Sequence, residues 1–144
     1  MCIRDSIQSE LKKLSINMKI EITPPSILRQ GKAKGKFDFF RASWIADYPN
    51  PENYFDLFSS KNKTPNGPNY TYFMNEKYDS IHNNLRSVQS DIKKSFEMLE
   101  NIIYDFSPII PLYYDMSIRL IKDNIIGMSN NAINMLNLEE VNKI

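Results

Sequence analysis

An aspartate set among aromatic residues is the part of this sequence best suited to chemistry. Asp47 lies between Trp44 and Tyr48, inside the aromatic-rich segment Phe37–Phe58. A carboxylate is costly to bury beside such rings unless a cation pairs with it. The spacing therefore predicts that Asp47 receives a positively charged ligand group, such as the amino terminus of a peptide. The alternative is a turn or cap residue, because aspartate is common before proline-rich turns.

Residue types that carry catalysis or bind metals are scarce. His82 is the single histidine and Cys2 the single cysteine, so neither an intrachain disulfide nor a zinc site can be assembled. We expect His82 to have a surface or helix-packing role. The sequence lacks a catalytic triad pattern, a nucleophile elbow and a phosphate-binding glycine loop. It therefore predicts a protein that is not an enzyme and that uses no cofactor.

The charge balance gives no general support for a nucleic-acid or membrane partner. The 144 residues include 18 basic and 17 acidic side chains, for a net charge of +1. One basic cluster, Arg29–Lys36, leaves a small nucleic-acid-binding module as an alternative function. Its charged members are Arg29, Lys32, Lys34 and Lys36, and Phe37, Phe39 and Phe40 follow them. A solvated loop is the simpler interpretation of so few charges.

The hydrophobic pattern predicts alternating helices and strands, which indicates an α/β fold. Helices are predicted at 6–14, 24–30, 50–58, 75–88 and 90–106, and strands at 16–22, 37–43, 109–114 and 118–121. Ser6 is expected to cap the first helix, and Gly127 to mark a turn. Each of the last three helices is expected to turn one face toward the core. These faces are, in chain order, Tyr54, Leu57 and Phe58; Tyr78, Ile81, Leu85 and Val88; and Ile92, Phe96, Leu99, Ile103 and Phe106.

An ordered set of motifs between Ile7 and Gly127 resembles the C-terminal part of bacterial extracellular solute-binding proteins of the oligopeptide/dipeptide type. These proteins are the receptors of peptide-importing ABC transporters. The motifs are Trp44 with Asp47, Pro51 with Glu52-Asn53-Tyr54, Asn69-Tyr70, Asp79-Ser80-Ile81, Pro108-Ile109-Ile110-Pro111-Leu112 and Ile125-Ile126-Gly127.

The resemblance implies a fragment of a two-lobed fold of the periplasmic binding protein type. Residues 7–108 would form part of the second lobe, and 109–144 a hinge crossing that returns to the first lobe. The N-terminal lobe would lie almost entirely outside this sequence. Residues 1–6 join abruptly to the rest, so we expect them to be a non-native leader.

The resemblance also implies ligand-binding roles for particular residues. Asp47 would receive the α-ammonium of a short peptide, and Trp44 would line a side-chain pocket. The main chain of Ser43, Ile45 and Ala46 would pair with the peptide backbone. Tyr48 and Tyr70 are weaker candidates for the same site.

The implied partners are ABC transporter permease subunits, and no nucleic acid is expected. The implied location is the periplasm or the outer face of the cytoplasmic membrane. A receptor of the same class with a non-peptide ligand stays open as an alternative.

Overall fold

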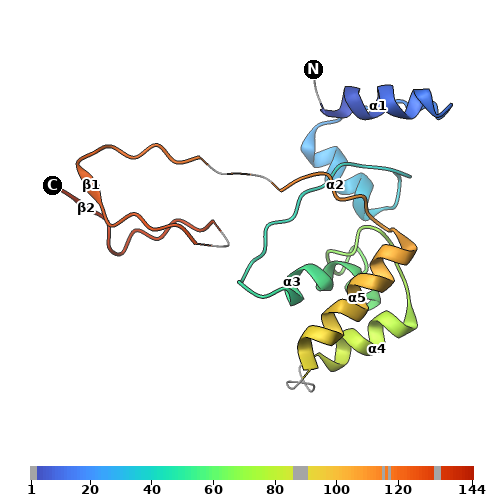
Figure 1. Cartoon of the computed structure of the whole chain (residues 1–144). Helices are drawn as coiled ribbons and strands as arrows, with labels where there is room; N and C mark the ends of the chain where they lie inside the picture. Colours follow the sequence, from blue (N-terminus) through green and yellow to red (C-terminus); the bar gives the residue numbers. More distant parts are fainter. Residues whose placement is uncertain (1–2, 86–90, 115, 117, 132–133) are drawn as a thin grey trace. The chain divides into compact units, whose positions relative to one another are not determined.

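A computed structural model describes residues 3–85, 91–114, 116, 118–131 and 134–144 of the chain (Figure 1). The chain divides into two compact units, Met1–Phe37 and Asp38–Ile144. Among the described residues, no helix is both long and apolar enough to cross a membrane.

Two helices, α1 (Ile3–Lys13) and α2 (Pro25–Ala33), make up the first unit. α1 begins before Ser6, so the expected cap is wrong, and it includes the described part of the expected leader. α2 begins with a proline in its first turn, as predicted, but it continues past Gln30. Gly31 lies buried inside it because the ring of Phe37 occupies the space that a Cβ would need.

A helical core dominates the second unit. α3 (Glu52–Phe55) runs into η1 (Asp56–Phe58), and η2 (Ser60–Asn62) follows. α4 (Glu76–Asn84) and α5 (Ile92–Phe106) lie side by side (Figure 1). The buried apolar side chains are Phe55, Phe58, Phe73, Tyr78, Leu85, Leu99 and Ile102.

The predicted inward faces of these helices are right in part. Phe58, Tyr78, Leu85 and Leu99 are buried as expected, and Leu57, Ile81, Phe96 and Ile103 pack against them. Tyr54 is instead 48% exposed, and its neighbour Phe55 is buried. α3 tightens into a 3₁₀ turn after one turn, which changes the angular period that the prediction assumed.

Two more of the expected core positions are wrong, and two expectations fall outside the description. Ile92 and Phe106 are exposed, whereas Ile102, which was not predicted, is buried. Val88 and the expected helix start at Ser90 lie outside the described residues.

Tyr78 connects α4 to α3. Its hydroxyl donates to the backbone oxygen of Phe55 at 2.7 Å, and its ring meets Phe58 and Phe73 edge to face. The side chain of Asn75 caps α4 by accepting from the Tyr78 backbone N–H at 2.9 Å. One tyrosine therefore fixes the distance between the first turn of α4 and the end of α3.

The loop between η1 and α4 is also anchored from within. Asn69 is fully buried, and its side-chain amide donates to the backbone oxygens of Ser59 at 3.1 Å and Phe73 at 2.9 Å. The carboxylate of Asp79 accepts from the backbone N–H of Ser60 at 2.9 Å. Two motif residues noted in the sequence thus hold this loop against α4.

The four predicted strands are not formed among the described residues. The strands among the described residues are a short antiparallel pair elsewhere in the chain, β1 (Ile125–Ile126) with β2 (Asn142–Lys143). A strand exists only when a neighbour pairs with its backbone groups. No described segment pairs in this way with 16–22, 37–43, 109–114 or 118–121, so these segments are irregular and their alternating pattern is not satisfied.

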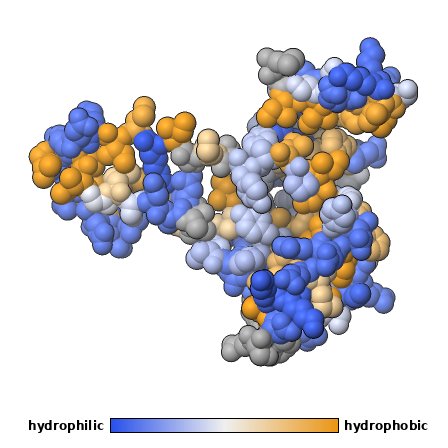
Figure 2. Space-filling view, in the orientation of Figure 1, coloured by the Kyte–Doolittle hydropathy of each residue, from blue (hydrophilic) through white to orange (hydrophobic). Residues whose placement is uncertain are grey.

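The unpaired segments leave large apolar side chains exposed. Leu120 is 97% exposed, and Ile16, Ile22 and Ile110 are exposed as well. Figure 2 shows hydrophobic residues gathered along the C-terminal stretch of the second unit. The turn expected at Gly127 lies instead at Asp123 and Asn124, directly before β1, although Gly127 has a positive φ of 81°.

The broad expectation of a mixed helix and strand fold agrees with this description. The two-lobed arrangement and the division after residue 108 stay predictions. So does the non-native origin of residues 1–6, of which Met1 and Cys2 lie outside the described residues.

We predict that Tyr78→Phe lowers the stability of the intact protein by about 1–2 kcal/mol. The variant keeps the buried ring and removes only the hydroxyl that donates to Phe55, which leaves that carbonyl without this donor. Thermal and denaturant unfolding would measure the change. Tyr104→Phe is the matched control because Tyr104 is exposed. Equal stability of the two variants would contradict the anchoring role of Tyr78.

Candidate functional site

A single side-chain oxygen holds the aromatic-acid motif in place. Asn53 Oδ1 accepts a hydrogen bond from the indole Nε1 of Trp44 at 2.8 Å and another from the backbone N–H of Asp47 at 3.2 Å. Asn53 is only 4% exposed. Both ends of the Trp-x-x-Asp motif are therefore attached to one buried group.

The start of α3 positions Asn53. The side chain of Asn50 accepts from the Glu52 backbone N–H at 2.9 Å, and its backbone oxygen accepts from the Asn53 N–H at 3.1 Å. Pro51 precedes the first helical residue, where its missing N–H has no cost. The Asn-Pro-Glu pattern predicted this helix start one residue too early, because Pro51 and not Asn50 stands at the N-cap.

Asp47 has a fixed backbone and an exposed carboxylate. Residues 47–50 form a bend, and Asp47 is exposed, contrary to the shielded position that its aromatic neighbours suggested. No described residue covers it, and none of them pairs with its carboxylate. The indole of Trp44 is 36% exposed beside it. The described site is therefore open, with an acid and one ring edge available to a ligand.

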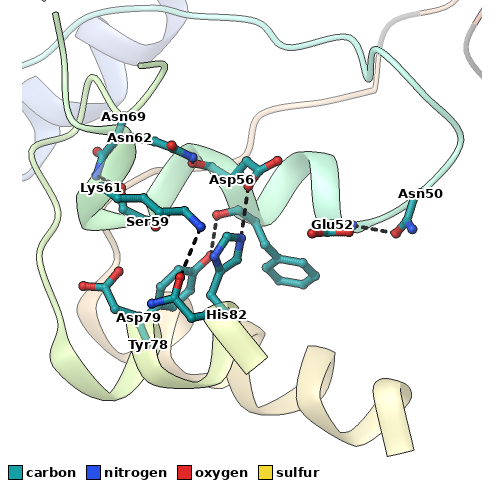
Figure 3. A network of polar contacts seen from close by, with 12 residues as sticks. Asn50, Glu52, Asp56, Ser59, Lys61, Asn62, Asn69, Tyr78, Asp79 and His82 are labelled. Carbon is teal, nitrogen blue, oxygen red and sulfur yellow. Dashed lines mark hydrogen bonds and ion pairs between the residues drawn. The ribbon is translucent and has the colours of Figure 1, made fainter. Parts of the chain in front are cut away.

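Tyr48 is joined to the core through Asp56. The Tyr48 hydroxyl donates to Asp56 Oδ2 at 3.4 Å. Figure 3 shows the other side of this carboxylate, where Asp56 Oδ1 lies 3.1 Å from His82 Nε2. Burial raises the pKa of the Tyr48 phenol, and the carboxylates of Asp56 and Glu52 add to the rise while Asn53 opposes it. The bend after Asp47 thus has a second attachment to the helical core.

His82 faces a small polar pocket. The pocket holds about 240 Å³ and is lined by Glu52, Asp56, Lys61, His82 and Asn83. The His82 side chain is 2% exposed, and neither ring nitrogen has an aligned hydrogen-bond partner among the described residues. No group of three or more acidic, histidine or cysteine side chains suited to a metal occurs in the described part of the chain.

The remaining predicted site residues lie in two places. Ser43, Ile45 and Ala46 lead directly into the bend in an irregular stretch, and Ile45 is exposed. Tyr70 lies in the loop before α4, where its backbone N–H donates to Pro68. The structure therefore brings Trp44, Asp47 and Tyr48 together around α3.

The residues of the basic cluster belong to the first unit. Arg29 and Lys32 lie on α2, whereas Lys34 and Lys36 follow its end. Burial lowers the pKa of Lys32, and the charge of Arg29 adds to this effect. A solvated loop is thus only part of the arrangement, because half of the cluster is helical.

Sequence reasoning missed Asn53 and Asp56 as parts of the site, whereas the buried His82, stacked on Tyr78, agrees with the expected helix-packing role. Asn53 entered only as one letter of a helix-start motif. A polar residue with low helix propensity in a short helix was the available signal, because asparagine there often bonds to nearby backbone. For His82 the signal was its place one turn after Tyr78 on the inner face of α4.

Comparison with known proteins shows which family part of this chain resembles. Residues 3–66 match the family of bacterial extracellular solute-binding proteins, family 5 middle region. Over these residues the chain is similar to this family.

Among its relatives is the dipeptide-binding protein DppE of Bacillus subtilis, 24% identical over 98% of this chain and 26% of the relative. The periplasmic murein peptide-binding protein MppA of Escherichia coli is 29% identical over 77% of this chain and 20% of the relative. The probable deoxycholate-binding periplasmic protein YgiS of Escherichia coli is 25% identical over 85% of this chain and 23% of the relative. The chain thus spans about a fifth to a quarter of the length of these relatives.

We predict that His82 makes stability depend on pH. Burial lowers the pKa of His82 below its ordinary 6.5, although Asp56 and Glu52 raise it and Lys61 lowers it further. The unfolded chain then binds the proton more readily than the folded chain, so stability falls as the pH drops below about 6.5. The slope from one proton cannot exceed about 1.4 kcal/mol per pH unit.

Urea unfolding of the intact protein between pH 7.5 and 5 would measure this slope. His82→Leu should lose less stability than the wild type between pH 7.5 and 5, because leucine fills the buried site with an apolar side chain that binds no proton. Identical pH slopes for the wild type and His82→Leu would show that His82 titrates alike in the folded and unfolded states.

Proposed function

We propose that this chain is the ligand-facing part of a receptor that captures short peptides for an ABC importer. In this proposal Asp47 receives the amino terminus of the peptide. Trp44 lines a side-chain pocket, and the main chain of Ser43, Ile45 and Ala46 pairs with the peptide backbone. The receptor would act in the periplasm or at the outer face of the cytoplasmic membrane, with permease subunits as partners.

The geometry of the motif is the observation that carries this proposal. Asn53 fixes the indole of Trp44 and the backbone of Asp47 at the same oxygen, while the Asp47 carboxylate is left exposed. A protein that only needed a turn here would gain nothing from an acid held rigidly and left without a partner. An incoming ammonium group would supply the missing cation.

Strand addition suits a receptor that accepts many peptides. Backbone hydrogen bonds do not depend on side-chain identity, so an unpaired stretch can hold peptides of different sequence. Residues 43–46 lie next to Asp47 and are outside the strands of the described fold. A peptide that anchors its amino terminus on Asp47 would run along this stretch.

The exposed apolar segments support the proposed place of the chain in a larger receptor. Segments 16–22, 109–114 and 118–121 carry a strand pattern and exposed side chains such as Leu120. We propose that other parts of the receptor cover them and complete the sheets of both lobes. Residues 7–108 would then belong to the second lobe, and 109–144 to the crossing toward the first.

A non-peptide ligand is the second candidate. The relative YgiS is named as a probable deoxycholate-binding protein, so the ligand class differs among the similar proteins. An exposed acid favours a cationic group, which argues for a peptide amino terminus over a bile acid. Neither the comparisons nor the site favours a nucleic-acid-binding module.

We predict that Asp47→Asn weakens peptide binding at least about tenfold. Removing one member of a desolvated charge pair typically costs about 2–5 kcal/mol. Calorimetry on the intact receptor, with a panel of unmodified tripeptides and their N-acetylated forms, would measure the effect. The wild type should prefer the free amino terminus, and Asp47→Asn should lose this preference.

Asp38→Asn is the matched control because Asp38 is also exposed and lies in the same unit. Its affinity for tripeptides should equal that of the wild type. If the wild-type receptor binds none of the peptides, the proposed function is wrong. Unchanged affinity of Asp47→Asn would remove this residue from the site.

A further inference from the structure

We infer that Asn53 is the positioning residue of this site: its side-chain oxygen sets where the Trp44 indole and the Asp47 carboxylate meet a ligand. The inference rests on the proposed function for its ligand, but its geometric part stands on the structure alone. Asn53 itself need not touch the ligand, because it acts through the two residues that it holds.

The first support is that one acceptor serves both groups. Nε1 of Trp44 and the backbone N–H of Asp47 both donate to Asn53 Oδ1. The indole has no other polar atom, so this bond fixes the rotation of the ring. Loss of the acceptor would free the ring and the Asp47 amide together, while Tyr48 would still attach the bend to Asp56.

The second support is the burial of Asn53. A buried amide oxygen that loses its donors bears a desolvation cost. The arrangement in which Trp44 and Asp47 donate to Asn53 is therefore favoured over arrangements without these hydrogen bonds. Asn53 also lies on α3, whose last residue, Phe55, is attached to Tyr78 in the core. The motif is therefore held by a rigid element and does not depend on loop packing alone.

Specificity for a charged amino terminus depends on this placement. The ammonium must approach Asp47 closely while the rest of the peptide runs past Trp44. A shift of about 1 Å in a supporting group is enough to loosen a preorganised site. Asn53 therefore controls the discrimination between a free and a blocked amino terminus more than the total affinity.

The test compares Asn53→Leu with Asn62→Leu in the intact receptor. Leucine is close in size to asparagine and cannot accept a hydrogen bond. Asn62 is a partly buried asparagine whose amide donates to the Asp56 backbone oxygen at 2.9 Å, so its loss is structural and does not involve Trp44 or Asp47. Both variants are expected to lower the unfolding temperature.

Two readouts separate positioning from stability. The indole N–H resonance of Trp44, assigned with Trp44→Phe, should move in Asn53→Leu and not in Asn62→Leu. Hydrogen exchange at the Asp47 amide should speed up at least about fivefold in Asn53→Leu only. An unmoved indole resonance with unchanged Asp47 exchange would overturn the inference.

Peptide binding supplies the functional readout. Asn53→Leu should reduce the preference for free over N-acetylated tripeptides by roughly tenfold, whereas Asn62→Leu should keep it. The effect of Asn53→Leu should shrink in a Trp44→Phe background, because the two changes remove the same contact. An unchanged preference in Asn53→Leu, or a full effect in that background, would contradict positioning.

Failure of the proposed function would look different. If the wild type binds no tripeptide, or shows no preference for a free amino terminus, the ligand assignment fails. The indole resonance and the amide exchange still decide whether Asn53 holds the motif, because neither readout needs a ligand.

Discussion

The hydrogen bond from the Tyr78 hydroxyl to the Phe55 carbonyl is the constraint on which the arrangement of the site depends. It fixes α3 against α4 within an aromatic core. Asn53 lies on α3, and its oxygen in turn fixes Trp44 and Asp47. The position of an exposed acid is thus determined by a buried phenol, through a short helix that would have little stability alone. The proposed binding at this surface would therefore depend on packing several residues away.

Local signals predicted the helices well and their faces less well. Asn75 correctly marked the start of α4, and Asn50-Pro51-Glu52 marked that of α3 to within one residue, because capping and proline chemistry act within a few residues. Tyr54 was placed inward in error, because α3 continues as a 3₁₀ turn and the period of 3.6 no longer applies. Leu99 lies deep enough in α5 for the regular period to hold, whereas Phe106 at its end is exposed.

The strands were predicted wrongly for a different reason, which is that they depend on distant partners. The alternating pattern of Ile16–Ile22 is real, but pairing needs a neighbour that the described residues do not provide. The motif itself could be found from Trp44 and Asp47, because aromatic rings beside an acid are unusual. Asn53 was harder to find: its residue type signals a bond to nearby backbone, but not that one amide oxygen accepts from two donors six and nine residues earlier.

The openness of the site is consistent with a receptor that must first meet its ligand in water. A buried, unpaired Asp47 would destabilise the empty protein, whereas an exposed carboxylate bears no such cost. Asn53 removes the backbone and ring freedom that would otherwise be lost on binding, so less entropy opposes capture. In the proposed function, ligand and receptor together exclude water, and the lower dielectric then strengthens the pairing of Asp47 with an ammonium. In the proposed site, the Asp47 carboxylate must therefore be held in place by α3 before binding and lose its water only when the ligand arrives.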